Sequence, residues 1–223
     1  MSPNCPKGPV LGPLVVCGVC FAQSNLHYLE KIGVKDSKLL SPEKRANLSK
    51  LIKNACVCYD SLVISAQEID KRFDNDINLN GLEMNKFAEI INELKPDIVY
   101  MDAADTNAEK FKNLIGKKLD YKPLKLISEH KADENYPIVS AASIIAKHKR
   151  DMIITSLREK YLNMGYSDLG SGYPSDERTI NFLKEWIRIE KRAPTFARKT
   201  WQTTKKILDL ELYNRKITQY FNE

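Results

Sequence analysis

The sequence predicts an α/β fold with a helical C-terminal region, and three observations support that prediction. Short apolar, β-branched runs alternate with segments of helical periodicity over residues 1–150. Beyond residue 150, apolar residues recur mainly at helical spacing. The length of 223 residues suits one sizeable domain with an appendage. We therefore expect an α/β core over 1–150, a helical region over 151–210 and a tail over 211–223.

Four apolar runs are the expected strands. The first is continuously apolar and β-branched, which is typical of a strand buried on both faces. The third follows Pro96 and ends on Asp102, so a carboxylate stands at the end of a strand. The four runs cover residues 14–21, 57–64, 97–102 and 123–128.

Capping and breaking residues mark the expected helices. Ser41-Pro42-Glu43 is typical of a helix start, with Ser41 as the N-cap and Pro42 at the first helical position. The helical pattern over 82–94 stops before Pro96, because the residue that precedes a proline disfavours helical geometry. Further helices are expected after Ser65 and over residues 109–115, 138–161, 180–187 and 201–208.

The charge balance favours a nucleic-acid partner. The formal net charge is +6 and the pI is near 8.9, and phosphates attract such a surface. A soluble basic protein without such a partner is the alternative. No apolar run approaches the roughly 18 residues of a membrane helix. The first six residues also lack the apolar segment of a secretory signal, so we expect a cytoplasmic protein.

The cysteines are expected to be reduced thiols. There are five, an odd number, and most lie in apolar strand-like runs rather than in a regular disulfide framework. Cys17-x-x-Cys20 has the spacing of half a zinc site, but Cys56-x-Cys58 does not supply a matching second half. We therefore expect no metal site at these cysteines.

Two acids are candidate metal ligands. Asp102 ends an expected strand, and Asp133 follows Glu129-His130 and precedes a helix. Acids at the carboxyl ends of strands lie where α/β sheets place functional groups, and paired carboxylates hold divalent ions. The alternative is that Asp102 caps a helix and that Asp133 pairs with Lys131 at the surface. Spacing alone leaves both readings open.

Six segments resemble type 2 ribonuclease H (ribonuclease HII), in particular its archaeal branch. They occur in the order and at the spacing of that family, from about residue 8 to residue 208. The segments are Gly8-Pro-Val-Leu-Gly-Pro-Leu-Val-Val16, Gly33-Val-Lys-Asp-Ser-Lys38, Met101-Asp-Ala-Ala-Asp105, Glu129-His-Lys-Ala-Asp133, Tyr136-Pro-Ile-Val-Ser-Ala-Ala-Ser-Ile-Ile-Ala-Lys147 and Gly170-Ser-Gly-Tyr-Pro-Ser-Asp176.

The resemblance implies both a fold and an activity. It implies a ribonuclease H-like fold, in which a mixed five-stranded sheet is flanked by helices and followed by a helical C-terminal region. It also implies an endonuclease that cuts the RNA strand of RNA–DNA hybrids, including ribonucleotides embedded in DNA, with Mn²⁺ or Mg²⁺. Of the four acids in the family's active site, two match Asp102 and Asp133.

The N-terminus departs from the family pattern. The family's Asp-Glu pair precedes the glycine-rich turn, and Pro3 and Asn4 stand at its two positions here. Proline offers no oxygen ligand and no backbone N–H, and an asparagine oxygen lacks the charge that holds a divalent ion. Two interpretations follow: an error at the 5′ end of the gene model, or a catalytically impaired homologue that binds hybrids. A clamp-associated factor without nuclease activity is a third.

The resemblance also implies residues that read the substrate. Backbone groups of Lys7 and Gly8 match the family's turn that contacts the ribose 2′-hydroxyl, and Tyr173 matches its tyrosine at the RNA–DNA junction. Tyr173 at a loop edge with no such role is the alternative. Candidate phosphate contacts, each equally explained as solvated surface, are Lys35, Ser37, Lys38 and Lys147.

The C-terminus resembles a peptide that binds a sliding clamp. The usual glutamine is replaced by Asn214, and Ile217, Tyr220 and Phe221 follow at the expected spacing. Such a segment forms one helical turn that presents its apolar side chains to a single pocket. A terminal amphipathic helix that packs on its own domain explains the same pattern.

Overall fold

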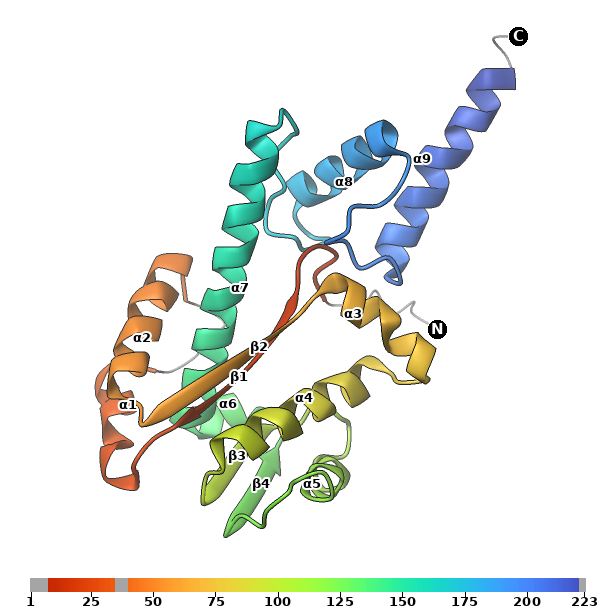
Figure 1. Ribbon diagram of the computed structural model, residues 1–223. Helices are drawn as coiled ribbons and strands as arrows, with labels where there is room; N and C mark the ends of the chain where they lie inside the picture. Colours follow the sequence, from red (N-terminus) through yellow and green to blue (C-terminus); the bar gives the residue numbers. More distant parts are fainter. Residues whose placement is uncertain (1–7, 35–39, 221–223) are drawn as a thin grey trace. The chain divides into compact units, whose positions relative to one another are not determined.

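A computed structural model describes residues 8–34 and 40–220, with side chains described as far as residue 212. The chain forms two compact units. The first comprises residues 1–14, 64–71 and 152–223, and the second comprises residues 15–63 and 72–151. Helix α7 (Pro137–Asn163) contributes residues to both (Figure 1). None of the helices in the described ranges combines the length and apolar composition of a membrane span.

The unit of residues 15–63 and 72–151 is an α/β unit, as the alternating pattern predicts. Along the chain, strand β1 is followed by two short helices, helix α2 and strand β2. Helix α5 comes between strands β3 and β4 in the sequence. The elements are β1 (Leu14–Cys20), η1 (Gln23–Asn25), α1 (His27–Lys31), α2 (Pro42–Ala55), β2 (Cys58–Ile64), η2 (Arg72–Asn75), α4 (Leu79–Leu94), β3 (Ile98–Asp102), α5 (Ala108–Gly116), β4 (Lys125–Glu129) and α6 (Ala132–Asn135).

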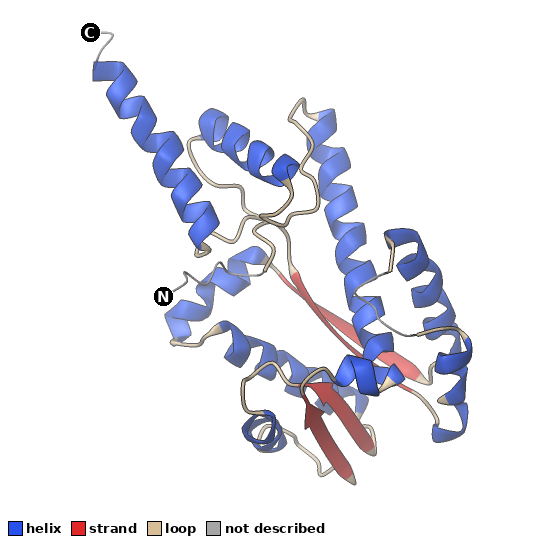
Figure 2. Cartoon of the chain, turned by 180° about the vertical axis from the view of Figure 1, so that it is seen from behind, coloured by secondary structure: helices blue, strands red, loops and turns tan. Residues whose placement is uncertain are grey.

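The four strands of the described chain form two pairs. β3 and β4 are parallel (Figure 2). Their register ends with Asp102 opposite Glu129. β1 pairs with β2, and the N–H of Val57 donates to the carbonyl of Cys20 at 2.8 Å, so the end of β1 lies beside the start of β2. The described strands are therefore mixed in direction: β3 and β4 are parallel, and β1 and β2 run in opposite directions. The position of the fifth strand that the resemblance implies, before Gly8, lies outside the described residues.

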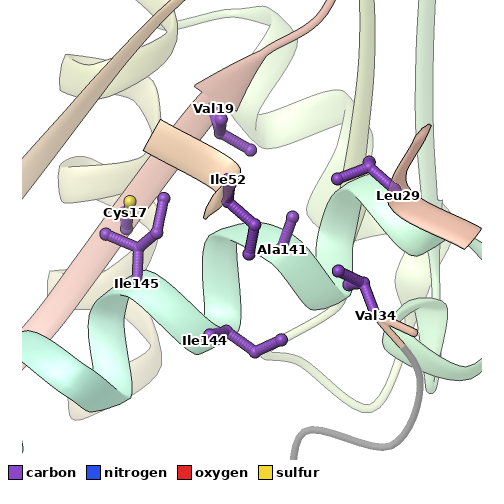
Figure 3. Close-up of a cluster of buried hydrophobic side chains, with 8 residues drawn as sticks. All are labelled: Cys17, Val19, Leu29, Val34, Ile52, Ala141, Ile144 and Ile145. Atoms are coloured by element: carbon purple, nitrogen blue, oxygen red, sulfur yellow. The ribbon is translucent and has the colours of Figure 1, made fainter. Parts of the chain in front are cut away.

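One buried cluster joins β1 to the helices beside it. Cys17 and Val19 of β1 meet Ile144 and Ile145 of α7, and Ile52 of α2 completes the contact (Figure 3). These side chains are at most 9% exposed, so they account for the continuous apolar character of the first strand.

Helix α4 packs on both strand pairs. A side chain at Gly18 of β1 would collide with Ile90 and Leu94, so the absence of a side chain there lets α4 approach the strand closely. Ile91, the next residue of α4, belongs to a second buried cluster with Val99 and Met101 of β3. Adjacent residues of one helix thus contact β1 and the β3 cluster.

The predicted helix ends are confirmed by the capping contacts. Ser41 Oγ accepts a hydrogen bond from the N–H of Lys44 at 3.3 Å, and Pro42 opens α2. Ser65 and Glu68 bond reciprocally before α3 (Ala66–Lys71). Helix α4 ends at Leu94, with Lys95 in a left-handed conformation at φ 45°.

The other unit is helical, as predicted for the C-terminal part of the chain. It contains α3, the end of α7, α8 (Glu177–Glu190) and α9 (Gln202–Tyr220). Its core is a cluster of aromatic rings whose centroids lie 4.9–6.1 Å apart. The rings are those of Tyr161, Tyr166, Phe182, Trp186 and Phe196.

Candidate functional site

Asp102 lies at the carboxyl end of β3, with its side chain exposed. Its Oδ1 accepts a hydrogen bond from the backbone N–H of Ala132 at 3.3 Å. The end of β3 and the start of α6 are therefore in contact, and the residue after Ala132 is Asp133. This contact brings together the two chain segments that carry the predicted metal ligands.

Asp133 lies in the first turn of α6, which begins after a left-handed residue, Lys131, at φ 57°. Its Oδ1 is buried. Its carbonyl accepts a hydrogen bond of 2.6 Å from the hydroxyl of Ser140, a residue of α7 that is fully buried. The start of α7 therefore fixes the turn that carries Asp133.

Glu129 and His130 precede this turn and make contacts of their own. The hydroxyl of Tyr136 donates to Glu129 Oε1 at 2.7 Å, and this bond raises the pKa of Tyr136. His130 Nε2 lies 3.2 Å from the carbonyl of Thr106. The side chain of His130 thus contacts the loop after β3. The Glu129–Tyr136 bond was not predicted, although both residues lie in motifs quoted above.

The carboxylates present here suit a divalent cation but do not complete its site. Carboxylate oxygens are the ligands that Mg²⁺ and Mn²⁺ prefer, and Asp102 and Asp133 provide them from adjoining segments. Within residues 8–34 and 40–220, however, no three His, Cys, Asp or Glu side chains are grouped so that they could hold a metal ion. Two acidic residues are fewer than the four that the resemblance implies.

The described cysteines are free thiols, as predicted: Cys17, Cys20, Cys56 and Cys58. Burial raises the pKa of Cys17 and of Cys20 to about 12. At neutral pH these side chains are therefore protonated and behave as small apolar groups.

Gly8 and Tyr173 belong to segments that meet in the other unit. The N–H groups of Val10 and Leu11 donate to the carbonyl of Gly172 at 2.8 and 3.1 Å. Gly172 is buried, whereas Tyr173, the next residue, is 38% exposed. The two segments for which the resemblance implies contact with the ribose are thus joined by hydrogen bonds.

Acidic side chains and a threonine hold the Gly170–Asp176 turn. Gly170 and Gly172 have φ of 68° and 81°, a conformation that glycine adopts without strain. Asp176 Oδ2 accepts from the N–H of Ser171 at 2.8 Å, and Thr179 Oγ1 accepts from the N–H of Gly172 at 2.9 Å. Hydrogen bonds from Arg178 and Ser171 keep the pKa of Asp176 well below its usual range. The turn is therefore tied to the first turn of α8.

A buried arginine fixes the segment that follows Gly8. Arg198 is 2% exposed, and its guanidinium donates to the carbonyls of Gly12 at 3.3 Å and Pro13 at 3.0 Å. It also lies 5.0 Å from the centre of the Trp201 ring. A side chain at Gly8 would lie 3.4 Å from Trp201 Nε1. Arg198 thus anchors this part of the chain by hydrogen bonds, and Trp201 lies beside Gly8. Neither residue was predicted as a site residue.

The remaining predicted residues are only partly described. Lys147 lies on α7 and is half-buried. Ile217 and Tyr220 lie within α9, which continues to Tyr220. Outside the described residues lie Lys7, Lys35, Ser37, Lys38 and Phe221, together with the N-terminal positions Pro3 and Asn4.

Comparison with solved structures identifies close structural relatives. The ribonuclease H2 of Pyrococcus horikoshii OT3 superposes with a TM-score of 0.84 and 40% identity, covering 92% of this chain and 94% of that one. A second relative comes from the structure of the PCNA:RNase HII complex of Archaeoglobus fulgidus. It has a TM-score of 0.78 and 41% identity, covering 90% of this chain and 92% of that one.

Sequence comparison gives the same result over almost the whole chain. Ribonuclease HII of Methanocella arvoryzae is 48% identical over 202 residues, covering 91% of this chain and 88% of that protein. Ribonuclease HII of Pyrococcus furiosus is 45% identical over 203 residues, covering 90% and 87%. The model of the ribonuclease HII family matches residues 5–204. The chain therefore belongs to the ribonuclease HII family, endonucleases that cleave RNA in RNA–DNA hybrids.

Proposed function

We propose that Asp102 and Asp133 are the catalytic carboxylates with which this protein cleaves the RNA strand of hybrids and ribonucleotides embedded in DNA. The observation that carries the proposal is the hydrogen bond from the N–H of Ala132 to Asp102, because it brings the end of β3 to the turn that holds Asp133. Acids at the carboxyl end of a parallel strand pair stand where α/β sheets place their chemistry.

In this proposal the two carboxylates hold Mg²⁺ or Mn²⁺ together with an Asp-Glu pair that precedes the glycine-rich turn. A bound divalent cation lowers the pKa of an attacking water and neutralises charge on the scissile phosphate. The protein's own part is to orient the acids. The N–H of Ala132 orients Asp102 by its bond to Oδ1, and Ser140 fixes the turn of Asp133. Cleavage leaves 3′-hydroxyl and 5′-phosphate ends.

Recognition of the ribose is assigned to the backbone of Lys7 and Gly8 and to the ring of Tyr173. Only RNA carries the 2′-hydroxyl, so contacts to that group select the ribonucleotide. The hydrogen bonds between Gly172 and the segment after Gly8 support this assignment, since they join the segment that carries Gly8 to the turn that carries Tyr173. Contacts to phosphate oxygens, without sequence preference, are assigned to Lys35, Ser37, Lys38 and Lys147.

Two versions of the protein test the cleavage proposal. One is the chain with Pro3 and Asn4 as they stand. The other carries a strand-forming segment that ends in Asp-Glu directly before Cys5. Each is incubated with a DNA duplex that contains one ribonucleotide, in Mg²⁺ and in Mn²⁺. We expect the second version to cut at the ribonucleotide, and the first to bind the duplex with little or no cutting.

The competing reading is a hybrid-binding homologue that has lost catalysis. It predicts that both versions bind the duplex and that neither cuts it. That outcome, with folding verified by circular dichroism, would remove Asp102 and Asp133 from their proposed role. Cleavage by the chain with Pro3 and Asn4 would instead show that the Asp-Glu pair is dispensable.

We further propose a sliding clamp as a partner of residues 214–223. The structure from Archaeoglobus fulgidus is that of a complex between ribonuclease HII and PCNA. Here Ile217 and Tyr220 lie about one turn apart along α9. Calorimetry of the full chain and of a chain ending at Tyr213 against the clamp tests this. Loss of binding on truncation supports the proposal, and equal binding contradicts it.

A further inference from the structure

The peptide groups on both sides of Gly172 are the junction between the two segments assigned to ribose recognition. Its N–H donates to Thr179 Oγ1 at 2.9 Å. Its carbonyl accepts from the N–H groups of Val10 and Leu11 at 2.8 and 3.1 Å. Both polar groups of this buried residue are therefore engaged, one by α8 and the other by the chain that follows Gly8.

The hydroxyl of Thr179 acts both as a hydrogen-bond acceptor and as a donor. While it accepts from Gly172, it donates to the carbonyl of Leu169 at 2.9 Å. The residue is fully buried, so water cannot replace either bond. A valine in its place would keep the shape of the side chain but remove both hydrogen bonds. The buried N–H of Gly172 and the carbonyl of Leu169 would then lose this partner.

The turn depends on such external bonds because its own conformation is not regular. Gly170 and Gly172 both have positive φ, so no repeating ladder of backbone bonds runs through the turn. Asp176 holds the N–H of Ser171, and Thr179 holds the N–H of the next residue. Thr179 thus holds the residue that precedes Tyr173, and the N–H of Tyr173 itself donates to Ser171 Oγ at 3.4 Å.

We propose that Thr179 is a positioning residue for ribonucleotide recognition, which acts by fixing the Gly172 peptide and thereby both Tyr173 and the segment after Gly8. The ligand is the ribose of a ribonucleotide at an RNA–DNA junction. This inference rests on the proposed roles of Gly8 and Tyr173. Thr179 is not a catalytic residue, because its hydroxyl is occupied by Gly172 and Leu169 within the protein.

The test measures discrimination rather than cleavage, so it uses the full chain as it stands. Fluorescence anisotropy gives Kd for a DNA duplex with one ribonucleotide and for the same duplex made only of DNA. For Thr179→Val we expect the ratio of the two Kd values to fall about tenfold, since the loss of one oriented hydrogen bond has that size. Affinity for the all-DNA duplex should stay unchanged, because phosphate contacts are independent of the turn.

Two further variants separate positioning from general damage. Thr179→Ser keeps the hydroxyl and should retain discrimination. Thr204→Val removes another buried hydroxyl of the same unit, and the Oγ1 of Thr204 has no hydrogen-bond partner among the described residues. It should therefore leave the ratio unchanged. If Thr179→Val does not fold, Thr179→Cys, whose thiol is a weaker donor and acceptor, should give an intermediate ratio.

The outcomes distinguish this inference from the proposed function. If the unaltered chain binds both duplexes equally, the proposed reading of the ribose is wrong. If the unaltered chain discriminates and a folded Thr179→Val variant discriminates equally well, the reading stands and the role of Thr179 is wrong. An equal loss in Thr204→Val would also overturn it, because the effect would then be one of core packing.

Discussion

The backbone N–H of Ala132 donates to the Oδ1 of Asp102, 3.3 Å away, so the carboxylate at the end of β3 is oriented by the helix turn that carries Asp133. Asp105 lies in the loop after the same strand, yet it bonds locally, to Thr106 and to the N–H of Asn107. Two acids close in the sequence thus have different surroundings, and they provide a matched pair for mutagenesis.

We predict that Asp102→Asn or Asp133→Asn lowers cleavage by roughly 100-fold or more in the version that carries an N-terminal Asp-Glu segment. The reason is the loss of an anionic ligand while the side-chain shape is kept. Single-turnover cleavage of a duplex with one ribonucleotide measures the effect. Asp105→Asn is the control and should retain full activity, since asparagine preserves its local turn. Equal loss in all three variants would contradict the assignment.

Gly170→Ala should destabilise the protein by roughly 1–3 kcal/mol. The backbone there has φ of 68°, and an added Cβ would lie 2.8 Å from Asp176 Oδ2 and 2.9 Å from Thr179 Oγ1. Gly116→Ala is the control, because its Cβ would make an ordinary contact of 3.5 Å with Leu126. Urea unfolding of both variants measures the difference. A Gly170→Ala variant as stable as the Gly116→Ala variant would mean that the turn relaxes freely.

Arg198→Met should cost about 2–4 kcal/mol of stability, because two carbonyls near the start of the described chain lose their buried donor. Those carbonyls are on Gly12 and Pro13. Arg192→Met is the control: its side chain is 77% exposed and its ion pair with Glu190 is long, at 3.9 Å. It should change the free energy of unfolding by less than about 0.5 kcal/mol. Comparable effects in both variants would show that Arg198 is not an anchor.

The raised pKa of the Cys17 thiol predicts that the folded protein loses stability at high pH. In the folded protein the pKa of Cys17 is raised from 9.0 to about 12, chiefly by burial. Below pH 9 the thiol is protonated in both states and its contribution is fully present. As the pH rises toward 12, the unfolded thiol ionises first and the contribution is lost. The free energy of unfolding should therefore fall between about pH 9 and pH 12, and fall less in Cys17→Ala.

The same burial predicts slow alkylation. Iodoacetamide at about pH 8 should modify Cys17 and Cys20 much more slowly in the folded protein than in urea, since the thiolate is the nucleophile. Mass spectrometry of peptides after timed quenching gives the rates. Rapid labelling of Cys17 in the folded state would show that the β1 core opens readily.

The secondary structure could be predicted closely from the sequence because its signals are local. Ser41 and Pro42 specify the start of α2, and Pro96 specifies the end of α4, through contacts within one helical turn. The strand over 97–102 differs from β3 by one residue. The capping box of Ser65 and Glu68 is likewise a contact of three residues' separation.

The contacts that shape the site are long-range, and the sequence carries no local sign of them. Arg198 and Gly12 are 186 positions apart. Thr179 bonds to Gly172, seven positions away, only because the turn reverses the chain before α8. Asp102 and Asp133 were predicted, but from strand ends and a family resemblance; the bond through Ala132 depends on how β3 and α6 pack. The fifth strand that the resemblance implies would precede Gly8, outside the described residues, and Pro3 and Asn4 stand at the two positions of its acids.

The position of α4 has a consequence for local unfolding. Ile90 lies against Gly18 of β1, and Ile91 lies in the cluster with Val99 and Met101 of β3. Unwinding of this one turn would expose apolar surface on both strand pairs in a single event. We therefore expect the amide hydrogens of β1 and β3, strands of separate pairs in the described chain, to be coupled in their exchange with solvent through two consecutive isoleucines.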